Sequence, residues 1–171
     1  INGEGNSFIG HTYPRTDANL DLGFHSGYRW RDLIVSGGVR FGATGDAHYL
    51  DDYEEGTWTP IIPSSGFTLT VYVATYIKIG RLVHVETGLL IPSNSDSSGL
   101  MLGGLPFTAQ SSGDNSGGLH VTSTNSGRND HFFAIRGQTN IGVATNQNLG
   151  VARSDYSNKQ LKFSGTYMAA S

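Results

Sequence analysis

The sequence predicts an all-β protein: a run of short strands that is stable only as an intertwined oligomer, followed by an antiparallel, jelly-roll-like β-sandwich. Three observations lead to this fold class. Gly (24), Ser (18), Thr (15) and Asn (11) make up about 40% of the 171 residues, and these types favour turns or strands over helices. Eight Phe, eight Tyr and two Trp supply the apolar surface that disordered chains lack. Short apolar runs recur about every ten residues, which is typical of sandwiches.

Composition and charge exclude several classes of protein. The formal net charge is −3 and no long basic run occurs, so the usual features of a nucleic-acid binder or an anionic-membrane binder are missing. No stretch approaches the roughly 20 consecutive apolar residues of a membrane-spanning helix, and no membrane insertion is expected. Cysteine is absent, which excludes disulfides and thiolate metal sites. Because the chain begins with Ile1 and not with Met, we expect it to be part of a longer protein.

The first 56 residues are expected to form a segment of their own. They carry nine acids against four arginines, whereas residues 57–171 carry five acids against seven basic residues, which indicates a boundary near Gly56. Apolar residues in segment 1–56 come in short clusters separated by glycines, and these clusters are too short to build a core. Such strands are stable when identical chains wrap around one another, so we predict an intertwined oligomer. An irregular extension lying across the main domain is the alternative.

Residues 57–171 are expected to form the sandwich. Phe67–Ile79 alternates apolar and polar residues and then changes register near Thr75, which predicts a bulge there. Leu82–Ile91 alternates in the same way and predicts a second strand. Seven further strands are expected at Trp58–Ile62, Leu100–Leu105, Gly118–Thr124, His131–Arg136, Gly142–Thr145, Leu149–Arg153 and Gln160–Met168.

Four short segments of the sequence resemble segments of one known family of proteins. The first two are Y-R-W-R-D-L-I-V-S-G-G-V at 28–39 and L-D-D-Y-E-E-G-T-W-T-P at 50–60. They resemble the junction that precedes the C-terminal β domain in tail fibre proteins of tailed bacteriophages. The segments Y-I-K-I-G-R-L-V at 76–83 and G-L-P-F-T-A at 104–109 resemble the framework of the same family. The resemblance covers residues 20–110 and does not extend beyond them.

In that family the junction is similar between phages, and the distal part varies with the host. The resemblance therefore implies a homotrimeric receptor-binding protein of the virion, at the distal end of the tail fibre and joined to the upstream part of the same fibre. Residues 1–56 would be the trimeric shaft end, and residues 57–171 the β-sandwich tip that binds the receptor. The intertwined assembly expected for residues 1–56 agrees with this implication.

The acidic run at the junction has two interpretations. We favour salt bridges, within or between chains, that fix the register where the shaft meets the head. The residues of this network are Arg29, Arg31, Arg40, Asp51, Asp52, Glu54 and Glu55. The alternative is a cation on the trimer axis, held by residues that lack the spacing of an EF-hand loop. The candidate ligands are Asp46, His48, Asp51 and Asp52.

Beyond residue 110, three polar segments suit a surface glycan. Sugars present hydroxyl groups and apolar ring faces, so their sites combine hydrogen-bonding side chains with a flat aromatic side chain. Residues 125–131 lead into Phe132, residues 153–158 contain Tyr156, and residues 145–148 are polar without an aromatic residue. The candidate glycan contacts are Asn125, Arg128, Asn129, Asp130, His131, Asn146, Asn148, Arg153, Asp155 and Tyr156. For each of them, an ordinary solvated turn is the alternative.

The expected function is adhesion to the host cell surface, through lipopolysaccharide or another glycan, without catalysis and without a cofactor. The five acids of residues 57–171 occur singly, and the protease-like string G-D-N-S-G-G at 113–118 contains an extra Asn. Two alternatives stay open. One is a capping domain that closes the fibre end and holds the chains in register. The other is a polysaccharide depolymerase or esterase, for example with Asp130 and Asp155 as its two carboxyl groups.

Overall fold

The computed structural model describes residues 31–41, 49–50, 52–112, 117–145 and 150–170. The chain divides into two compact units, Ile1–Ser36 and Gly37–Ser171. The described residues of the first unit, 31–36, are exposed and form no strand. In the second unit, β1 (Val39–Arg40) and β2 (Tyr49–Leu50) pair as a two-stranded antiparallel sheet. The intertwined arrangement of residues 1–56 stays a prediction.

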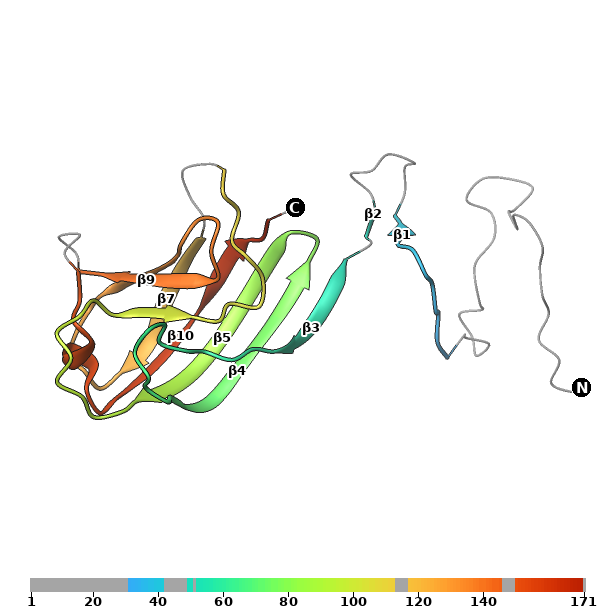
Figure 1. The fold of residues 1–171 in the computed structure, drawn as a ribbon. Coiled ribbons are helices and arrows are strands. Elements are labelled where there is room, and N and C mark those ends of the chain that lie inside the picture. Colours follow the sequence, from blue (N-terminus) through green and yellow to red (C-terminus); the bar gives the residue numbers. More distant parts are fainter. Residues whose placement is uncertain (1–30, 42–48, 51, 113–116, 146–149, 171) are drawn as a thin grey trace, which may run out of the picture. The chain divides into compact units, whose positions relative to one another are not determined.

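The other strands of the described residues form one antiparallel sheet of eight. Their order is β3-β4-β5-β10-β7-β8-β9-β6, and Figure 1 shows the first five of them side by side. The bounds are β3 (Tyr53–Thr57), β4 (Thr70–Ile79), β5 (Leu82–Ile91), β6 (Met101–Gly103), β7 (Gly117–Thr124), β8 (His131–Ala134), β9 (Asn140–Ala144) and β10 (Lys159–Met168). The prediction of an all-β, antiparallel fold is confirmed. The predicted boundary near Gly56 falls within β3, and the assignment of a shaft and a tip stays a prediction.

The sheet curls around a single core. Ile61, shortly after β3, exchanges backbone hydrogen bonds of 3.0 and 2.8 Å with Gly103 of β6. Because β3 and β6 are the two edge strands, this bridge brings the ends of the sheet together. The enclosed face carries fully buried side chains such as Val83, Phe163 and Tyr167. The two halves of the sheet thus cover one core between them, as in a sandwich.

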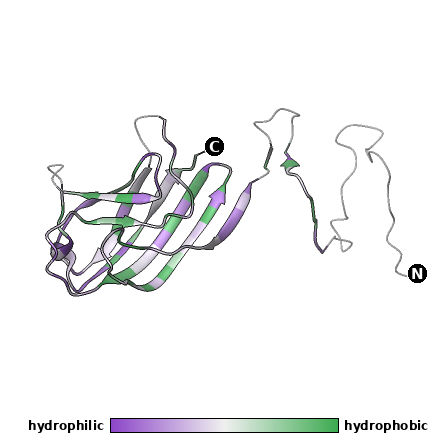
Figure 2. Ribbon diagram, in the orientation of Figure 1, coloured by the Kyte–Doolittle hydropathy of each residue, from purple (hydrophilic) through white to green (hydrophobic). Residues whose placement is uncertain are grey.

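Buried and exposed side chains alternate along β5, whereas a change of register interrupts this alternation in β4. In β5, Val83 is fully buried and its neighbour Leu82 is exposed. Figure 2 shows hydrophobic and hydrophilic bands along the long strands of the sheet. In β4 the register with β5 shifts between Val71 and Val73, so the bulge lies there and not near Thr75. As a result, both of these valines are exposed and the odd-numbered residues that follow face solvent.

Two predicted strands are wrong. Residues 58–62 form only the bridge at Ile61, because Pro60 cannot donate the N–H that a ladder requires. Residues 150–153 form isolated bridges and run into a 3₁₀ helix, η2 (Arg153–Tyr156), whose Asp155 carboxylate accepts a 3.0 Å hydrogen bond from the Ala152 N–H. None of the helical turns in the described part of the chain has the length and apolar character needed to cross a bilayer.

Candidate functional site

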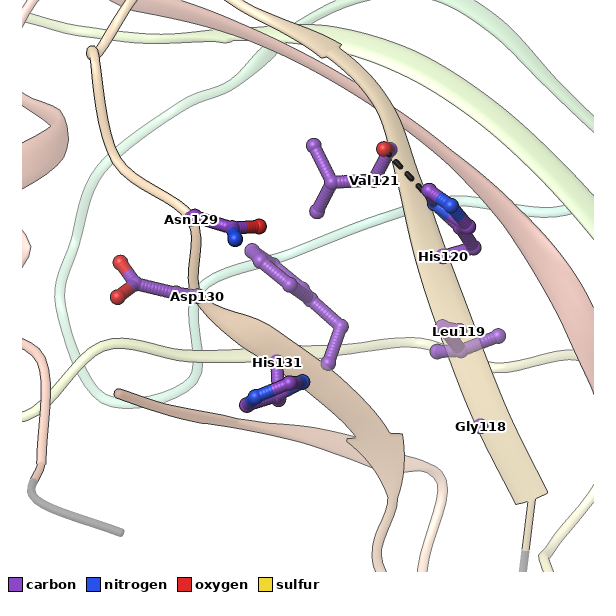
Figure 3. Close-up of a pocket in the computed structure, with 8 residues that line it drawn as sticks. Gly118, Leu119, His120, Val121, Asn129, Asp130 and His131 are labelled. Atoms are coloured by element: carbon purple, nitrogen blue, oxygen red, sulfur yellow. Dashed lines mark hydrogen bonds between the residues drawn. The ribbon is translucent and has the colours of Figure 1, made fainter. Parts of the chain in front are cut away.

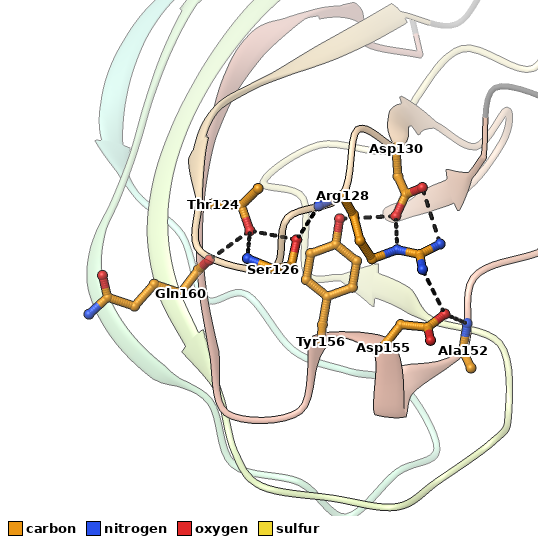
Figure 4. Close-up of polar contacts among 8 residues, drawn as sticks. All are labelled: Thr124, Ser126, Arg128, Asp130, Ala152, Asp155, Tyr156 and Gln160. Carbon is orange, nitrogen blue, oxygen red and sulfur yellow. Dashed lines mark hydrogen bonds and ion pairs between the residues drawn. The ribbon is translucent and has the colours of Figure 1, made fainter.

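Two of the polar segments predicted to bind a glycan lie against each other. The loop 125–130 between β7 and β8 contacts η2 through the Arg128 guanidinium (Figure 4). Arg128 Nε donates to Asp130 Oδ2 at 2.6 Å and Nη2 donates to Asp130 Oδ1 at 3.3 Å. Arg128 Nη1 lies 3.5 Å from Asp155 Oδ2. One cation therefore links the carboxylates of the two segments.

Side chains of the loop also hold its own backbone. Thr124 Oγ1 accepts from the Ser126 N–H at 3.1 Å, and Ser126 Oγ accepts from the Arg128 N–H at 3.2 Å. Asn125 Oδ1 accepts from the Gln160 N–H of β10 at 2.8 Å. Such local bonds favour turns over regular structure. Asn125, a predicted glycan contact, thus fixes the loop to β10.

Tyr156 is buried and adds a second contact between η2 and the loop 125–130. Its hydroxyl donates to Asp130 Oδ2 at 3.1 Å, and its ring packs edge-on against Phe132 at 6.4 Å between ring centroids. Burial, together with the charge of Asp130, raises the pKa of Tyr156 to about 12. The Asp130 side chain is only 5% exposed. Neither residue offers its polar or aromatic group to a ligand in this structure.

Arg153 also faces inward. Its Nη1 donates to Asp96 Oδ2 at 2.7 Å, and its Nη2 donates to the Pro63 carbonyl at 3.1 Å. Hydrogen bonds from Ser98 and from the Arg153 guanidinium lower the pKa of Asp96 to about 2. This ion pair ties η2 to the loop after β5. Arg153 is therefore a bracing residue in the described structure.

An open groove lies where β7 and β8 separate. The two strands pair only at Gly118 with Phe133 and at Leu119 with Phe132, although β7 continues to Thr124 along β10. The gap that results has a volume of about 380 Å³. Its lining consists of Gly118, Leu119, His120, Val121, Asn129, Asp130, His131 and Phe132.

Three exposed polar side chains border this groove. His120 stands on β7, Asn129 lies in the loop before β8, and His131 is the first residue of β8. Figure 3 shows the Asn129 side chain directed toward β7 and the Asp130 side chain directed away from it. One imidazole nitrogen of His120, Nδ1, lies 2.9 Å from the Val121 carbonyl oxygen, which fixes the ring and leaves the other nitrogen available. Amide and imidazole groups both donate and accept hydrogen bonds.

The aromatic residue of this surface is Phe133, which the sequence analysis did not select. Phe133 is 42% exposed, whereas Phe132 is 2% exposed and belongs to the core. On the two neighbouring strands its partners are Gly118 and Gly142. A Cβ added to Gly142 would lie 2.4 Å from Phe133 Cζ, so the ring lies directly over this glycine. The glycine allows an exposed aromatic ring to lie close to the sheet.

Phe133 was recognisable from strand alternation. In β8 the exposed and buried residues alternate, with His131 and Phe133 exposed and Phe132 and Ala134 buried. A polar His131 on the solvent face places Phe133 on that same face. Phe132, the aromatic residue into which residues 125–131 lead, is the buried neighbour of Phe133.

The described junction side chains include two pairs between residues close in the sequence. Arg31 bonds Asp32 at 2.9 Å, and the Tyr53 hydroxyl donates to Glu55 at 2.9 Å. Among the described residues, no ion pair joins an arginine of the predicted set to Asp52, Glu54 or Glu55. Pairing between chains stays a prediction. Arg29 and Asp51 lie outside the described residues, and Arg40 has an interaction of its own within the chain.

The acidic string instead contacts the other segments that resemble the fibre family. Asp52 pairs with Lys78, and the Tyr76 hydroxyl donates to Glu54. The Lys78 ammonium lies 5.2 Å from the centroid of the Phe107 ring, and Tyr76 packs edge-on against the same ring. Residues of strings 50–60, 76–83 and 104–109 thus meet in one cluster that anchors the start of β3.

The remaining predicted site residues are not described. Asn146 and Asn148 lie outside the described residues, as do the candidate metal ligands Asp46, His48 and Asp51. Within the described ranges, no group of three or more His, Asp or Glu side chains gathers as a metal site would require. Comparisons with protein-family models, with curated proteins and with solved structures find no match for this chain.

Proposed function

We propose that the chain is the C-terminal region of a tailed-bacteriophage tail fibre, located at the distal end of the fibre in the virion. It assembles as a homotrimer, continues from the upstream part of the fibre and attaches to the host cell surface. The resemblance of four strings supports this family. The meeting of three of them around Lys78 and Phe107 adds support, because a shared framework requires its recurring segments to contact one another.

The receptor in this proposal is lipopolysaccharide or another surface glycan, bound in the groove between β7 and β8. The observation that carries the proposal is the exposed ring of Phe133 on the same face as His120, Asn129 and His131. An aromatic face binds the apolar face of a sugar ring, and the imidazole and amide groups bind its hydroxyls. The groove volume of about 380 Å³ falls within the range of small-ligand sites.

The ion pairs and hydrogen bonds that hold the loop 125–130 support this site indirectly. A loop that binds sugars needs side chains in fixed positions, because ordering them during binding costs free energy. The ion pairs of Arg128 hold the loop that carries Asn129, and the buried Asp130 holds the start of β8. The two acids considered for catalysis, Asp130 and Asp155, are both engaged by this guanidinium. The arrangement supports adhesion more than hydrolysis.

Because several grooves can bind at once, a weak glycan affinity in each groove is sufficient for attachment. Three copies on one fibre tip present three identical grooves, and simultaneous binding raises the overall avidity by a factor of roughly 10² to 10⁴ when the receptors are suitably spaced. Affinity per groove can then stay in the millimolar range.

The test is retention of the full chain on a panel of purified bacterial surface polysaccharides, with the glycan length measured before and after. We expect retention on at least one polysaccharide without shortening. N129A should reduce that retention at least tenfold, and T70A, at an exposed position at the start of β4, should not. Shortened glycans would identify a depolymerase instead. A folded, assembled protein that is retained on none would identify a capping domain.

A further inference from the structure

Lys78 is the one buried residue among the three lysines of the chain. Its side chain is 9% exposed, and its ammonium contacts the carboxylate of Asp52, which is 48% exposed. The ring of Phe107 lies on the other side, with its centroid 5.2 Å from the ammonium. A lysine amine that is shielded from water acts as a nucleophile once it has lost its proton. The proposed binding of a glycan makes no use of this amine.

A second carboxylate stands beside this pair. Glu54 of β3 is the cross-strand partner of Lys78 on β4, and side chains that lie directly opposite have Cβ atoms about 5 Å apart. The Tyr76 hydroxyl donates to Glu54 Oε1, which orients the carboxylate and leaves its second oxygen able to accept a proton. The Lys78 amine therefore has one carboxylate in contact and another within reach.

We propose that Lys78 and Asp52 condense to an amide that ties the start of β3 to β4. The Lys78 ammonium gives a proton to Glu54, and the free Nζ attacks Asp52 Cγ. The Nζ–Cγ bond forms and one Cγ–O bond breaks. Two of the three ammonium protons pass through Glu54 to the departing oxygen, which leaves as water. An ammonium and a carboxylate thus become a neutral amide and water, without any other reactant.

The fold supplies what this condensation lacks in free solution, where water disfavours it. Groups held in contact react as if present at effective concentrations of up to roughly 10⁵ to 10⁸ M. Phe107 and Tyr76, which pack edge-on, shield the amine. The amide closes residues 52–78 into a loop and limits the freedom of the unfolded chain, as a disulfide does. In a chain without cysteine, it provides a covalent tie of another kind.

The experiment follows the intact mass of the full chain over time after cell-free synthesis. We expect the native chain to become lighter by one water, and a digest to contain one peptide pair joined through Asp52 and Lys78. K78R and D52A should keep the full mass. E54Q should form the link roughly a hundredfold more slowly, because it cannot carry the proton. E55Q is the matched control, since the exposed Glu55 carboxylate accepts from Tyr53 and should not affect the link.

A native chain that keeps the full mass of its sequence, with Asp52 and Lys78 in separate peptides, would overturn this inference. A loss of water that persists in K78R and D52A would also overturn it, and native linking rates in E54Q would remove Glu54 from the step. Circular dichroism checks that each variant is folded. The link is independent of the proposed function: K78R should retain the glycan and F133A should form the link, so the two can fail separately.

Discussion

Replacing Phe133 by alanine removes the exposed aromatic ring of the proposed glycan surface. The residue is 42% exposed, and a phenylalanine presents roughly 200 Å², so about 80 Å² of apolar surface is available to a sugar ring. At about 25 cal/mol per Å², burial of this area contributes ~2 kcal/mol to binding. We therefore expect F133A to weaken the binding of a polysaccharide fragment by about 30-fold.

The assay is a calorimetric titration with monovalent fragments of a polysaccharide that retains the native protein. F133W keeps a flat aromatic surface and should bind like the native chain, whereas F133L keeps apolar area without a flat face and should bind weakly. Urea unfolding confirms that each variant is folded, because the ring also covers Gly142. A folded F133A that binds within twofold of the native protein would refute the argument.

Two further predictions concern the two glycine partners of Phe133 and the Asp96–Arg153 ion pair. G142A should weaken glycan binding and lower the melting temperature, because its Cβ would lie 2.4 Å from Phe133, whereas G118A has nothing within 4 Å and should keep native stability; equal melting temperatures for the two would contradict this reasoning. Hydrogen bonds from Ser98 and from the Arg153 guanidinium hold the pKa of Asp96 at about 2, below its ordinary value of 3.8, so these contacts together stabilise the fold fully above pH 3.8 and their contribution is lost as the pH falls toward 2. D96N should remove this pH-dependent step from urea-unfolding curves, and an unchanged step would show that other carboxylates cause it.

Strands were predictable where apolar and polar residues alternate within one short stretch of the sequence. The predicted strand Leu82–Ile91 matches β5, since each second residue faces the core. The bulge in β4 was misplaced: it lies between Val71 and Val73, which are both exposed, and not near Thr75. The partner of Val73 after the register shift is Gly88, fifteen positions away. The position of a bulge depends on such a partner, which alternation within one strand does not reveal.

The residue types near the candidate site were predictable from the sequence, but the direction of their side chains was not. The polar residues 125–131 include three that line the groove, Asn129, Asp130 and His131. Asp130 and Tyr156, which are 26 positions apart, turned out to bond each other in the interior. Residue type alone does not distinguish a side chain that braces a loop from one that faces solvent, because this depends on what packs behind the loop.

The chemical shifts of three histidine rings test the central claim most directly, that a surface glycan binds in the groove between β7 and β8. His120 and His131 line this groove, whereas His84 stands on β5, two strands away on the same sheet. During titration with fragments of a polysaccharide that retains the protein, we predict that the ring signals of His120 and His131 shift and that those of His84 do not. Unchanged signals of His120 and His131 at saturating glycan would contradict the account.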